Sequence, residues 1–520
     1  MYFVYMFICL QDKIIDRAAI IESQHVNRVV EACKGRTIFI TGGTGFMGKV
    51  LVEKLLRTCI GIKRIYLLVR LKKGKQPDER LREMFKGVLF EKVKKLNGPD
   101  IVKKVVVIPG DVSLPNLGIS SENRKILAEE VELVYHCAAT IRFDETLKKA
   151  VLLNTRGTKY MLELAKEMKD LLVFVYVSTA YCHLNERVLY EKSYPPPANP
   201  HYIIKAVEWM DEEIVTSITD KLLGNCPNTY AFTKALAESL VDEQMDKLPV
   251  IIVRPSIVIP IWKEPVPGWT DNINGPTGLL IGAGKGIIRS MYCNSKGYAD
   301  YLPVDVAVNG IIITSWDYIG FKKRRYYNLT SSGEIKVSWQ QVIELGRRIV
   351  ETKMPLNGVV WYPGGSMKKS KIMHLICVAL FHYLPAAVID FFICLSGNKP
   401  VLWRIQKRIS KGFEVFEYYA NNQWDFNNDD SLKARHLMNE KEKEDFKVDG
   451  KGLDLDEYFT HCVHATRLYI LNEPDDTLPS ARRHMLMMWG LDRLCKFILL
   501  LGLGYVTFYF IIAPLLGITL

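Results

Sequence analysis

The stretch TIFITGGTGFMGKVLVEKLL, residues 37–56, decides the fold of this chain. Its first five residues are a short β-rich apolar run, and its last eight carry apolar residues at helical spacing. Between the two, Gly42, Gly45 and Gly48 follow a G-x-x-G-x-x-G spacing. Strand, glycine turn and helix in this order are the context that a dinucleotide fingerprint requires. The stretch predicts a site where the backbone approaches a pyrophosphate at a helix N-terminus.

The residues after the next expected strand, 64–69, indicate which dinucleotide binds. A NAD-binding protein tends to place Asp or Glu there, whereas this chain has Arg70, Lys72 and Lys73 and no acidic residue between 58 and 77. A carboxylate would repel the 2′-phosphate of NADP, and an arginine can bind it bidentately. We therefore predict NADPH rather than NADH; the alternative reading is a solvated basic loop.

Further strands extend the pattern. We expect them at 105–108, 133–135, 173–177 and 250–253, and small residues follow several of their ends. Strands that alternate with helices from residue 36 to about 260 predict a doubly wound α/β domain with a parallel sheet. Ligands bind such a sheet at the carboxyl ends of its strands.

Four side chains form a candidate catalytic set. Ser178 and Thr179 end the fifth strand, and Tyr230 precedes Lys234 by four residues in NTYAFTKALAESL, so the latter two share one helix face. A lysine ammonium beside a phenol is expected to lower the pKa of the phenol. Such a tyrosine can deliver a proton to a carbonyl oxygen, and a hydroxyl at 178 or 179 can donate a hydrogen bond to that oxygen.

Composition excludes several classes of protein. The chain has 520 residues, of which 48% are hydrophobic and 24% charged, which rules out collagen, a disordered tail and a small disulfide scaffold. The net charge of +12 is spread along the chain, which favours an anionic cofactor, an anionic substrate and a membrane face over nucleic acid. The eleven cysteines contain no C-x-x-C pair, so we expect reduced thiols.

The C-terminus predicts a membrane anchor. Residues 497–520 contain no charged side chain and are long enough to cross a hydrocarbon core of about 30 Å. Basic residues precede the segment and none follows it, so the positive-inside rule places the body in the cytosol. Pro514 and Gly517 leave open whether the segment spans once or turns back.

Two other apolar stretches are less clear. Residues 372–395 also contain two histidines, a proline and Asp390, so a spanning helix, a re-entrant hairpin and a wall of a lipid pocket all stay open. We favour a membrane-facing or substrate-facing element over a clean span. Residues 1–10 are too short to span and have no signal-peptide pattern, so we interpret them as a hydrophobic arm.

The series of motifs resembles one family. The stretches that carry the resemblance are TGGTGFMGKVLVEKLLR, IYLLVRLKKGK, GDVSLPNLG, AATIRFDETLK, VSTAY, YEKSYPPP, NTYAFTKALAE, VRPSIV, EPVPGWTDNINGPTG, GAGKGIIR and KPVLWRIQKRISKGFEVFEYYANNQWDFNNDD. Together they are similar to the insect-type fatty acyl-CoA reductases, which are extended short-chain dehydrogenase/reductases. The resemblance covers roughly residues 35 to 475, and the first 34 residues depart from the usual family start.

The resemblance implies a Rossmann-type sheet with a smaller, mainly helical C-terminal domain and a C-terminal transmembrane segment. It implies this division: extension 1–34, catalytic domain 35–345, apolar connecting region 346–398, C-terminal reductase domain 399–475, basic linker 476–496 and anchor 497–520. It also implies reduction of a long-chain acyl-CoA to a primary alcohol with two NADPH, without a metal. A C-terminal anchor suits the endoplasmic reticulum or the peroxisomal membrane equally, and the oligomeric state stays open.

The residue roles follow from the same resemblance. The catalytic residues are Ser178, Thr179, Tyr230 and Lys234. The residues expected at the cofactor are Thr41, Gly42, Thr44, Gly45, Phe46, Met47, Gly48, Arg70, Asp111, Val112, Ala138, Ala139, Asn154, Tyr230, Lys234, Pro255 and Ser256. Three alternatives stay open: an enzyme that stops at the aldehyde, a reductase of another lipid carbonyl, and a non-catalytic NADPH-binding membrane scaffold.

Overall fold

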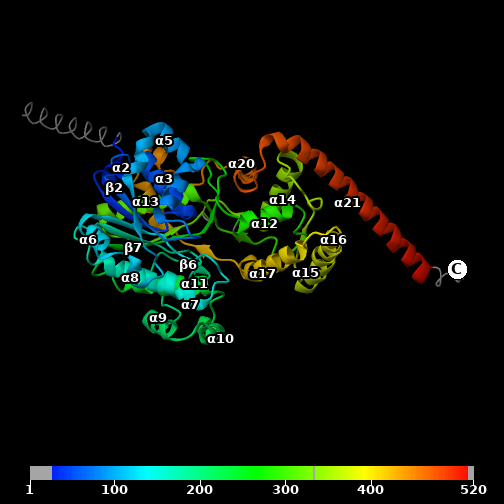
Figure 1. The fold of residues 1–520 in the computed structure, drawn as a ribbon, viewed down its shortest axis with the longest axis horizontal. Coiled ribbons are helices and arrows are strands. Elements are labelled where there is room, and N and C mark those ends of the chain that lie inside the picture. The colour runs from blue at the N-terminus through cyan, green and yellow to red at the C-terminus, as the bar shows by residue number, and fades with distance from the viewer. Residues whose placement is uncertain (1–25, 274, 332–333, 513–520) are drawn as a thin grey trace, which may run out of the picture. The chain divides into compact units, whose positions relative to one another are not determined.

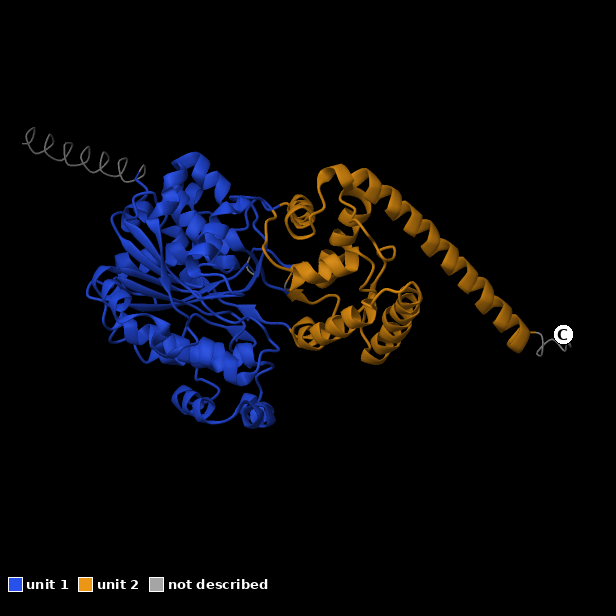
Figure 2. Cartoon of the chain, in the orientation of Figure 1, with its two compact units in different colours: residues 1–267, 299–336, 423–453 blue, residues 268–298, 337–422, 454–520 orange. Residues whose placement is uncertain are grey.

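A computed structural model describes residues 26–273, 275–331 and 334–512. The arm at 1–10, most of the N-terminal extension, and Pro514 and Gly517 lie outside the described residues. The chain divides into two compact units, which Figure 2 draws in blue and orange. Unit 1 comprises Met1–Pro267, Ala299–Lys336 and Gln423–Leu453, and unit 2 comprises Gly268–Tyr298, Val337–Asn422 and Asp454–Leu520. The six segments expected from the sequence are a different division and stay a prediction.

A seven-stranded sheet forms the centre of unit 1, and all of its strands are parallel. In spatial order the strands are β12 (Tyr326–Leu329), β7 (Val250–Pro255), β5 (Val173–Val177), β4 (Leu133–His136), β1 (Thr37–Thr41), β2 (Arg64–Val69) and β3 (Val105–Pro109). β1, β4 and β5 are buried at every position, as expected for strands covered on both faces. The predicted doubly wound parallel sheet is confirmed.

Helices cover both faces of this sheet (Figure 1). One face packs on side chains of α6, α8 and α11, and α3 and α13 pack together over the other. The helices of unit 1 are α2 (Arg28–Cys33), α3 (Phe46–Thr58), α4 (Pro77–Lys86), α5 (Glu91–Asn97), α6 (Ser121–Glu130), α7 (Leu147–Ala150), α8 (Gly157–Ala165), α9 (Pro200–Trp209), α10 (Glu212–Leu223), α11 (Thr229–Asp242), α13 (Val304–Phe321), α18 (Asp429–His436) and α19 (Glu440–Asp445).

A late segment of the chain returns to complete unit 1. The short strand β15 (Asp425–Phe426) pairs with β6 (Val188–Leu189), and α18 packs on α13 and β12. At the other end of the chain, Arg28 donates to the buried carboxylate of Glu442 at 2.8 Å. The described part of the N-terminal extension is therefore tied to α19 by an ion pair.

Unit 2 is mainly helical. Its helices are α12 (Pro276–Gly284), α14 (Trp339–Arg348), α15 (Lys371–Val378), α16 (Leu384–Leu395), α17 (Leu402–Asn421), α20 (Leu455–Ala465) and α21 (Leu478–Thr507). Its paired strands β9 (Ser290–Tyr292) and β14 (Ser366–Lys368) contact α15 and α17. This helical unit agrees with the smaller C-terminal domain that the sequence predicts.

Two helices of unit 2 are long and apolar enough to cross a membrane by length and composition: Lys371–Leu395 and Asp475–Ile512. In the first, α15 and α16 are joined by a π-helical turn, Ala379–Tyr383, so the chain does not reverse direction between 371 and 395. The alternative that this stretch forms a re-entrant hairpin is therefore wrong. Pro385 follows directly after this π-helical turn, inside the continuous helix.

The second apolar helix begins well before the uncharged segment. α21 starts at Leu478 and runs on through a π-helical turn, Phe508–Ile512, so the residues expected as a basic linker are helical. Asp492, buried on unit 2, accepts a hydrogen bond from Trp361 Nε1 at 2.8 Å. From Phe497 to Ile512 every described residue is exposed.

Candidate active site

The glycine turn after β1 is as tight as the fingerprint requires. Gly42 has a φ of 75°, and a Cβ there would lie 2.7 Å from the backbone nitrogen of Ala138. A Cβ at Gly48 would lie 2.2 Å from the carbonyl oxygen of Gly42. Gly45 is the N-cap of α3, whose first two residues are Phe46 and Met47. The three glycines thus let the backbone of the turn fold tightly against the start of α3 without side chains of their own.

Thr41 and His136 join β1 to β4 directly behind this turn. Thr41 Oγ1 lies 2.6 Å from His136 Nδ1, and it accepts a hydrogen bond from the Ala138 nitrogen at 3.3 Å. The other ring nitrogen lies 3.0 Å from Thr158 Oγ1. Burial, with the nearby charge of Lys234, lowers the pKa of His136 to about 3, so the ring is neutral. The structure thus places Thr41 as a support of the turn.

Basic side chains gather beside the turn, and the sequence analysis missed one of them. Arg80, on α4, donates to Thr44 Oγ1 at 3.0 Å and to the Arg70 carbonyl at 2.8 Å. Arg70 itself lies 3.4 Å from the carboxylate of Asp111. Desolvation and the charges of Arg70 and Arg80 lower the pKa of Lys72, which indicates a locally positive field. Arg80 was hard to find because it lies 32 residues beyond Gly48, in another helix.

Asp111 and Val112 follow β3 and shape the adenine end of the predicted site. Asp111 Oδ1 accepts from the backbone and hydroxyl of Ser113 at 2.9 and 2.8 Å. A Cβ at Gly157 would lie 2.8 Å from the carbonyl of Val112, so the start of α8 packs closely on this loop. Both predicted residues lie at the carboxyl edge of the sheet.

The predicted catalytic side chains come together at the carboxyl end of β5. Ser178 and Thr179 follow this strand and are 5% and 6% exposed. Thr179 hydrogen-bonds to the side chain of Tyr230, which is partly buried and packs edge-on against Phe143 with ring centroids 5.5 Å apart. Lys234, one turn further along α11, is 2% exposed. A reactive carbonyl beside Tyr230 would therefore meet a threonine hydroxyl.

The pKa relation expected between Tyr230 and Lys234 is wrong for this structure. Lys234 Nζ donates to the carbonyl of Val177 at 2.7 Å and lies 4.7 Å from the ring centroid of Tyr176, and it does not shift the phenol. Desolvation instead raises the pKa of Tyr230, against the hydrogen bond from Thr179, which lowers it. Desolvation also lowers the pKa of Lys234 to about 8.

Asn154 lies in a π-helical turn, Val151–Arg156, and is 1% exposed. Its side-chain oxygen accepts from the Thr140 nitrogen at 2.8 Å, and its side-chain nitrogen donates to Thr233 Oγ1 at 2.9 Å. The side chain thus ties the loop after Ala139 to α11. π-helical turns are frequent at functional sites. The predicted role of Asn154 at the cofactor stays a prediction.

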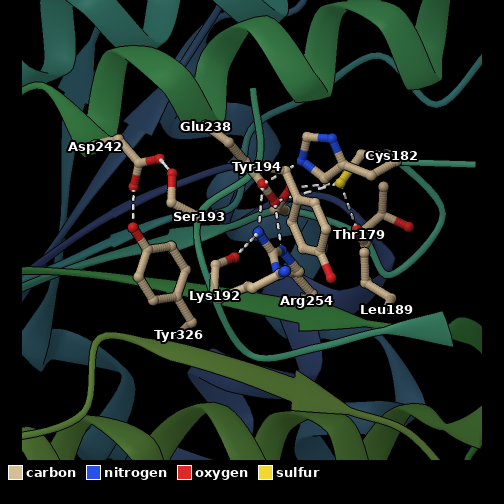
Figure 3. Close-up of polar contacts among 12 residues, drawn as sticks. Thr179, Cys182, Leu189, Lys192, Ser193, Tyr194, Glu238, Asp242, Arg254 and Tyr326 are labelled. Carbon is tan, nitrogen blue, oxygen red and sulfur yellow. Dashed lines mark hydrogen bonds and ion pairs between the residues drawn. The ribbon is translucent and has the colours of Figure 1, made fainter. Parts of the chain in front are cut away.

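A buried ion pair supports the catalytic loop (Figure 3). Arg254 on β7 donates to both carboxylate oxygens of Glu238 at 2.9 and 2.8 Å. Cys182 donates to Glu238 at 3.4 Å and to the Thr179 carbonyl at 3.0 Å. Glu238 lies one turn after Lys234, so the network connects the loop at 179–183 to α11 and to β7. In the sequence, only the spacing of four residues between Lys234 and Glu238 pointed to this network.

The same network contains His183, whose Nε2 lies 2.8 Å from Glu238. Burial lowers the pKa of His183, but Cys182 and Glu238 outweigh it and raise the pKa to about 10. The Arg254 guanidinium and the His183 imidazolium both pair with the single carboxylate of Glu238. The expectation that no metal takes part stays a prediction.

Pro255 and Ser256 end the site on the β7 side. The Pro255 carbonyl accepts from the Ala180 nitrogen at 2.9 Å, which places this turn against the catalytic loop. Ser256 Oγ is buried and has no hydrogen-bond partner among the described residues. An unpaired buried hydroxyl, the glycine turn and the positive field together fit a nicotinamide dinucleotide at this edge of the sheet.

Comparisons of the sequence with known proteins agree with this geometry. The NAD-binding profile described as "Male sterility protein" matches residues 40–311, and the Sterile profile with the same description matches residues 381–473. The chain is 40% identical to fatty acyl-CoA reductase 1 of Rattus norvegicus, over 88% of this chain and 89% of that protein. It is 37% identical to the fatty acyl-CoA reductase wat of Drosophila melanogaster, over 86% of each.

Solved structures share the fold. The terminal R domain of the myxalamid PKS-NRPS pathway has a TM-score of 0.58 at 20% identity, over 84% of this chain and 92% of that one. The reductase domain of a non-ribosomal peptide synthetase from Mycobacterium tuberculosis has a TM-score of 0.56 at 19% identity, over 86% and 97%. The similarity to these relatives covers almost the whole length of both chains. The chain is therefore an oxidoreductase with a nicotinamide cofactor and belongs to the fatty acyl-CoA reductase family.

Proposed function

We propose that this protein reduces long-chain fatty acyl-CoA to the primary fatty alcohol, with two NADPH, and releases CoA. The observation that carries the proposal is the meeting of Tyr230 with Thr179 at the strand end beside the glycine turn. This is where a carbonyl has to lie to be close to a dinucleotide at a parallel sheet.

The residues of the chain divide the work as follows. NADPH, when bound, supplies the hydride. Tyr230 gives a proton to the carbonyl oxygen, and its raised pKa keeps it protonated at neutral pH. Thr179 or Ser178 donates a hydrogen bond to the same oxygen as negative charge develops on it. Lys234, buried one turn along α11 from Tyr230, holds a positive charge at the Val177 carbonyl, directly before Ser178.

The thioester and the aldehyde use the same site in turn. The tetrahedral hemithioacetal formed from the thioester returns its hydroxyl proton to Tyr230 as its carbon–sulfur bond breaks, the carbonyl re-forms and CoA leaves as a thiolate. The resulting aldehyde is reduced in a second round, which again needs one proton from Tyr230. No cysteine nucleophile is required, and burial raises the pKa of Cys137 to about 12, which keeps it a thiol.

Arg70 and Arg80 support NADPH as the cofactor. Arg80 donates to the backbone carbonyl of Arg70 just after β2, where a 2′-phosphate is expected, and the carboxylate of Asp111 pairs with Arg70. The locally positive field that lowers the pKa of Lys72 suits the charge of a 2′-phosphate. An anchor at 497–520, with the body in the cytosol at the endoplasmic reticulum or peroxisomal membrane, completes the proposal.

The test is the amount of NADPH oxidised and free CoA released per palmitoyl-CoA by the full chain in detergent. Two NADPH and one CoA support alcohol formation. One NADPH and one CoA indicate an enzyme that stops at the aldehyde. CoA release without NADPH oxidation indicates hydrolysis, and neither signal at any chain length indicates another lipid carbonyl or a scaffold.

Variants connect that stoichiometry to the site. We expect Tyr230→Phe to lower NADPH oxidation at least 100-fold, because general acid catalysis typically contributes about 10²–10⁴. Tyr202→Phe, at a tyrosine 71% exposed on α9, is the matched control and keeps full activity. Equal activity of both variants contradicts the assigned role of Tyr230.

A further inference from the structure

The helix 371–395 of unit 2 has its polar and apolar faces inverted. Its buried stripe consists of His374, Cys377, Val378, His382, Ala386 and Asp390. Its outward side chains are apolar, for example Ile372, Leu384 and Phe392 at 73%, 54% and 63% exposure. A soluble helix normally buries its apolar face, so this surface requires a cover.

Polar contacts hold the buried stripe along almost the whole helix. His374 Nδ1 lies 2.9 Å from Ser290 Oγ, and His382 Nε2 accepts from the Ser290 nitrogen at 3.1 Å. Asp390 accepts from the nitrogens of Leu402 and Trp403, at 3.0 and 2.7 Å, at the start of α17. The first and last of these residues, His374 and Asp390, are 16 residues apart, or about 24 Å along the helix axis.

The first half of the neighbouring helix α17, with the loop before it, carries charge of one sign. No acidic residue lies between Asp390 and Glu414. The exposed basic residues in this interval are Lys399, Arg404, Lys407, Arg408 and Lys411. α17 is tied beside the apolar helix, because Tyr383 Oη lies 3.0 Å from Ser410 Oγ. An apolar face bordered by a basic helix is complementary to an anionic lipid surface.

We propose that helix 371–395 lies in the plane of an anionic membrane surface, with its apolar face in the lipid and the basic side chains of α17 at the phosphates. The helix does not cross the bilayer, because its polar face, from His374 to Asp390, is bonded to other residues of unit 2. A spanning helix would have to carry that part of unit 2 into the hydrocarbon. This attachment is separate from the anchor at 497–520 and does not rest on the proposed reaction.

Depth measurements on the full chain in vesicles test the proposal. Single nitroxide labels are placed by Met373→Cys, Leu384→Cys and Phe391→Cys, at two ends and the middle of the helix, where exposure is 51%, 54% and 60%. The background carries Cys9→Ser, Cys394→Ser and Cys495→Ser, which removes Cys9, outside the described residues, and the exposed cysteines within them. Ile214→Cys, at an apolar residue 48% exposed on α10, is the control.

We expect all three labels to favour oxygen over a water-soluble nickel chelate and to report similar depths of about 5–10 Å, with the control label in water. A middle label deeper than the end labels by about 10 Å or more would mean a spanning helix, since 11 residues rise about 16 Å. Shielding from both reagents would mean a protein cover, such as a second copy. Labels in water would mean no docking. Each of these three results overturns the proposal.

Charge reversal tests the basic side separately. In vesicles with phosphatidylserine, Lys407→Glu with Arg408→Glu should lower the ratio of immersed to water-exposed label at least 10-fold, since each basic residue near such a surface contributes about fivefold. The matched control is Lys205→Glu with Lys221→Glu, at exposed lysines of α9 and α10. An equal effect of both pairs, or none from the first, overturns the role of α17.

Discussion

At the scale of single residues, the charge on Lys234 sets an alkaline limit on activity. Burial lowers its pKa to about 8, whereas the pKa of Tyr230 is raised, so the lysine loses its proton first as pH rises. The ammonium is the active form, so kcat/KM should fall about 10-fold per pH unit above pH 8. Lys234→Arg keeps its charge, and its remaining activity should show no such decline between pH 7 and 10. A decline that persists in this variant contradicts the assignment.

Arg80 should decide the choice of cofactor. A hydrogen bond to a charged group is worth about 1.5–3 kcal/mol, so Arg80→Ala should weaken NADPH binding about 10- to 150-fold and leave NADH binding unchanged. Titration of cofactor fluorescence measures both affinities. Arg82→Ala, at an exposed arginine on the same helix, is the control. Equal loss of both cofactors would instead indicate damage to α4.

Residue types and spacing predicted which side chains meet, but not how each one is solvated. The sequence was sufficient to place Ser178, Thr179, Tyr230 and Lys234 at the end of β5, since strand end and helix face fix their positions; their catalytic roles stay a prediction. The predicted sign of the pKa shift of Tyr230 was wrong, because the shift depends on the burial of the phenol and on the hydrogen bond that Lys234 donates to the Val177 carbonyl. Neither quantity can be read from spacing.

At the scale of elements, the junction of β1 and α3 tolerates no side chain at Gly48. Gly48→Ala would push a methyl group onto the Gly42 carbonyl oxygen, a backbone atom that cannot rotate away. We expect NADPH binding to weaken at least 10-fold and the free energy of unfolding to drop by about 1–3 kcal/mol. Isothermal titration and urea unfolding measure these effects. Gly320→Ala, at a helical glycine with open space around it, should change neither.

The elements were predicted best where buried runs are long. The six expected strands are all present, and 37–41, 64–69 and 173–177 have the expected bounds. β12 was missed, because its four residues follow a basic run and pair only with β7, far earlier in the chain. The inverted helix at 371–395 was ambiguous, because only the contacts of its polar residues show which face is covered.

At the scale of the whole molecule, two truncations should separate anchoring from folding. A chain that ends at Lys496 keeps Asp492 and its bond to Trp361, so it should stay active on acyl-CoA in detergent and become extractable from membranes by alkaline carbonate. A chain that ends at Thr477 loses that contact and should be less stable. If the 1–496 chain stays in the membrane after carbonate extraction, residues 497–520 are not the only anchor and helix 371–395 does not lie merely at the membrane surface.

The unbroken course of α21 has a mechanical consequence. Its 30 residues correspond to about 45 Å, more than the roughly 30 Å of a hydrocarbon core, and its first half is fixed to unit 2 by Asp492. Because no loop separates unit 2 from the anchor within α21, the connection is a rigid helix rather than a flexible linker. In the proposed anchoring, unit 2 therefore keeps a constant height and tilt above the bilayer and cannot swivel freely while the protein diffuses.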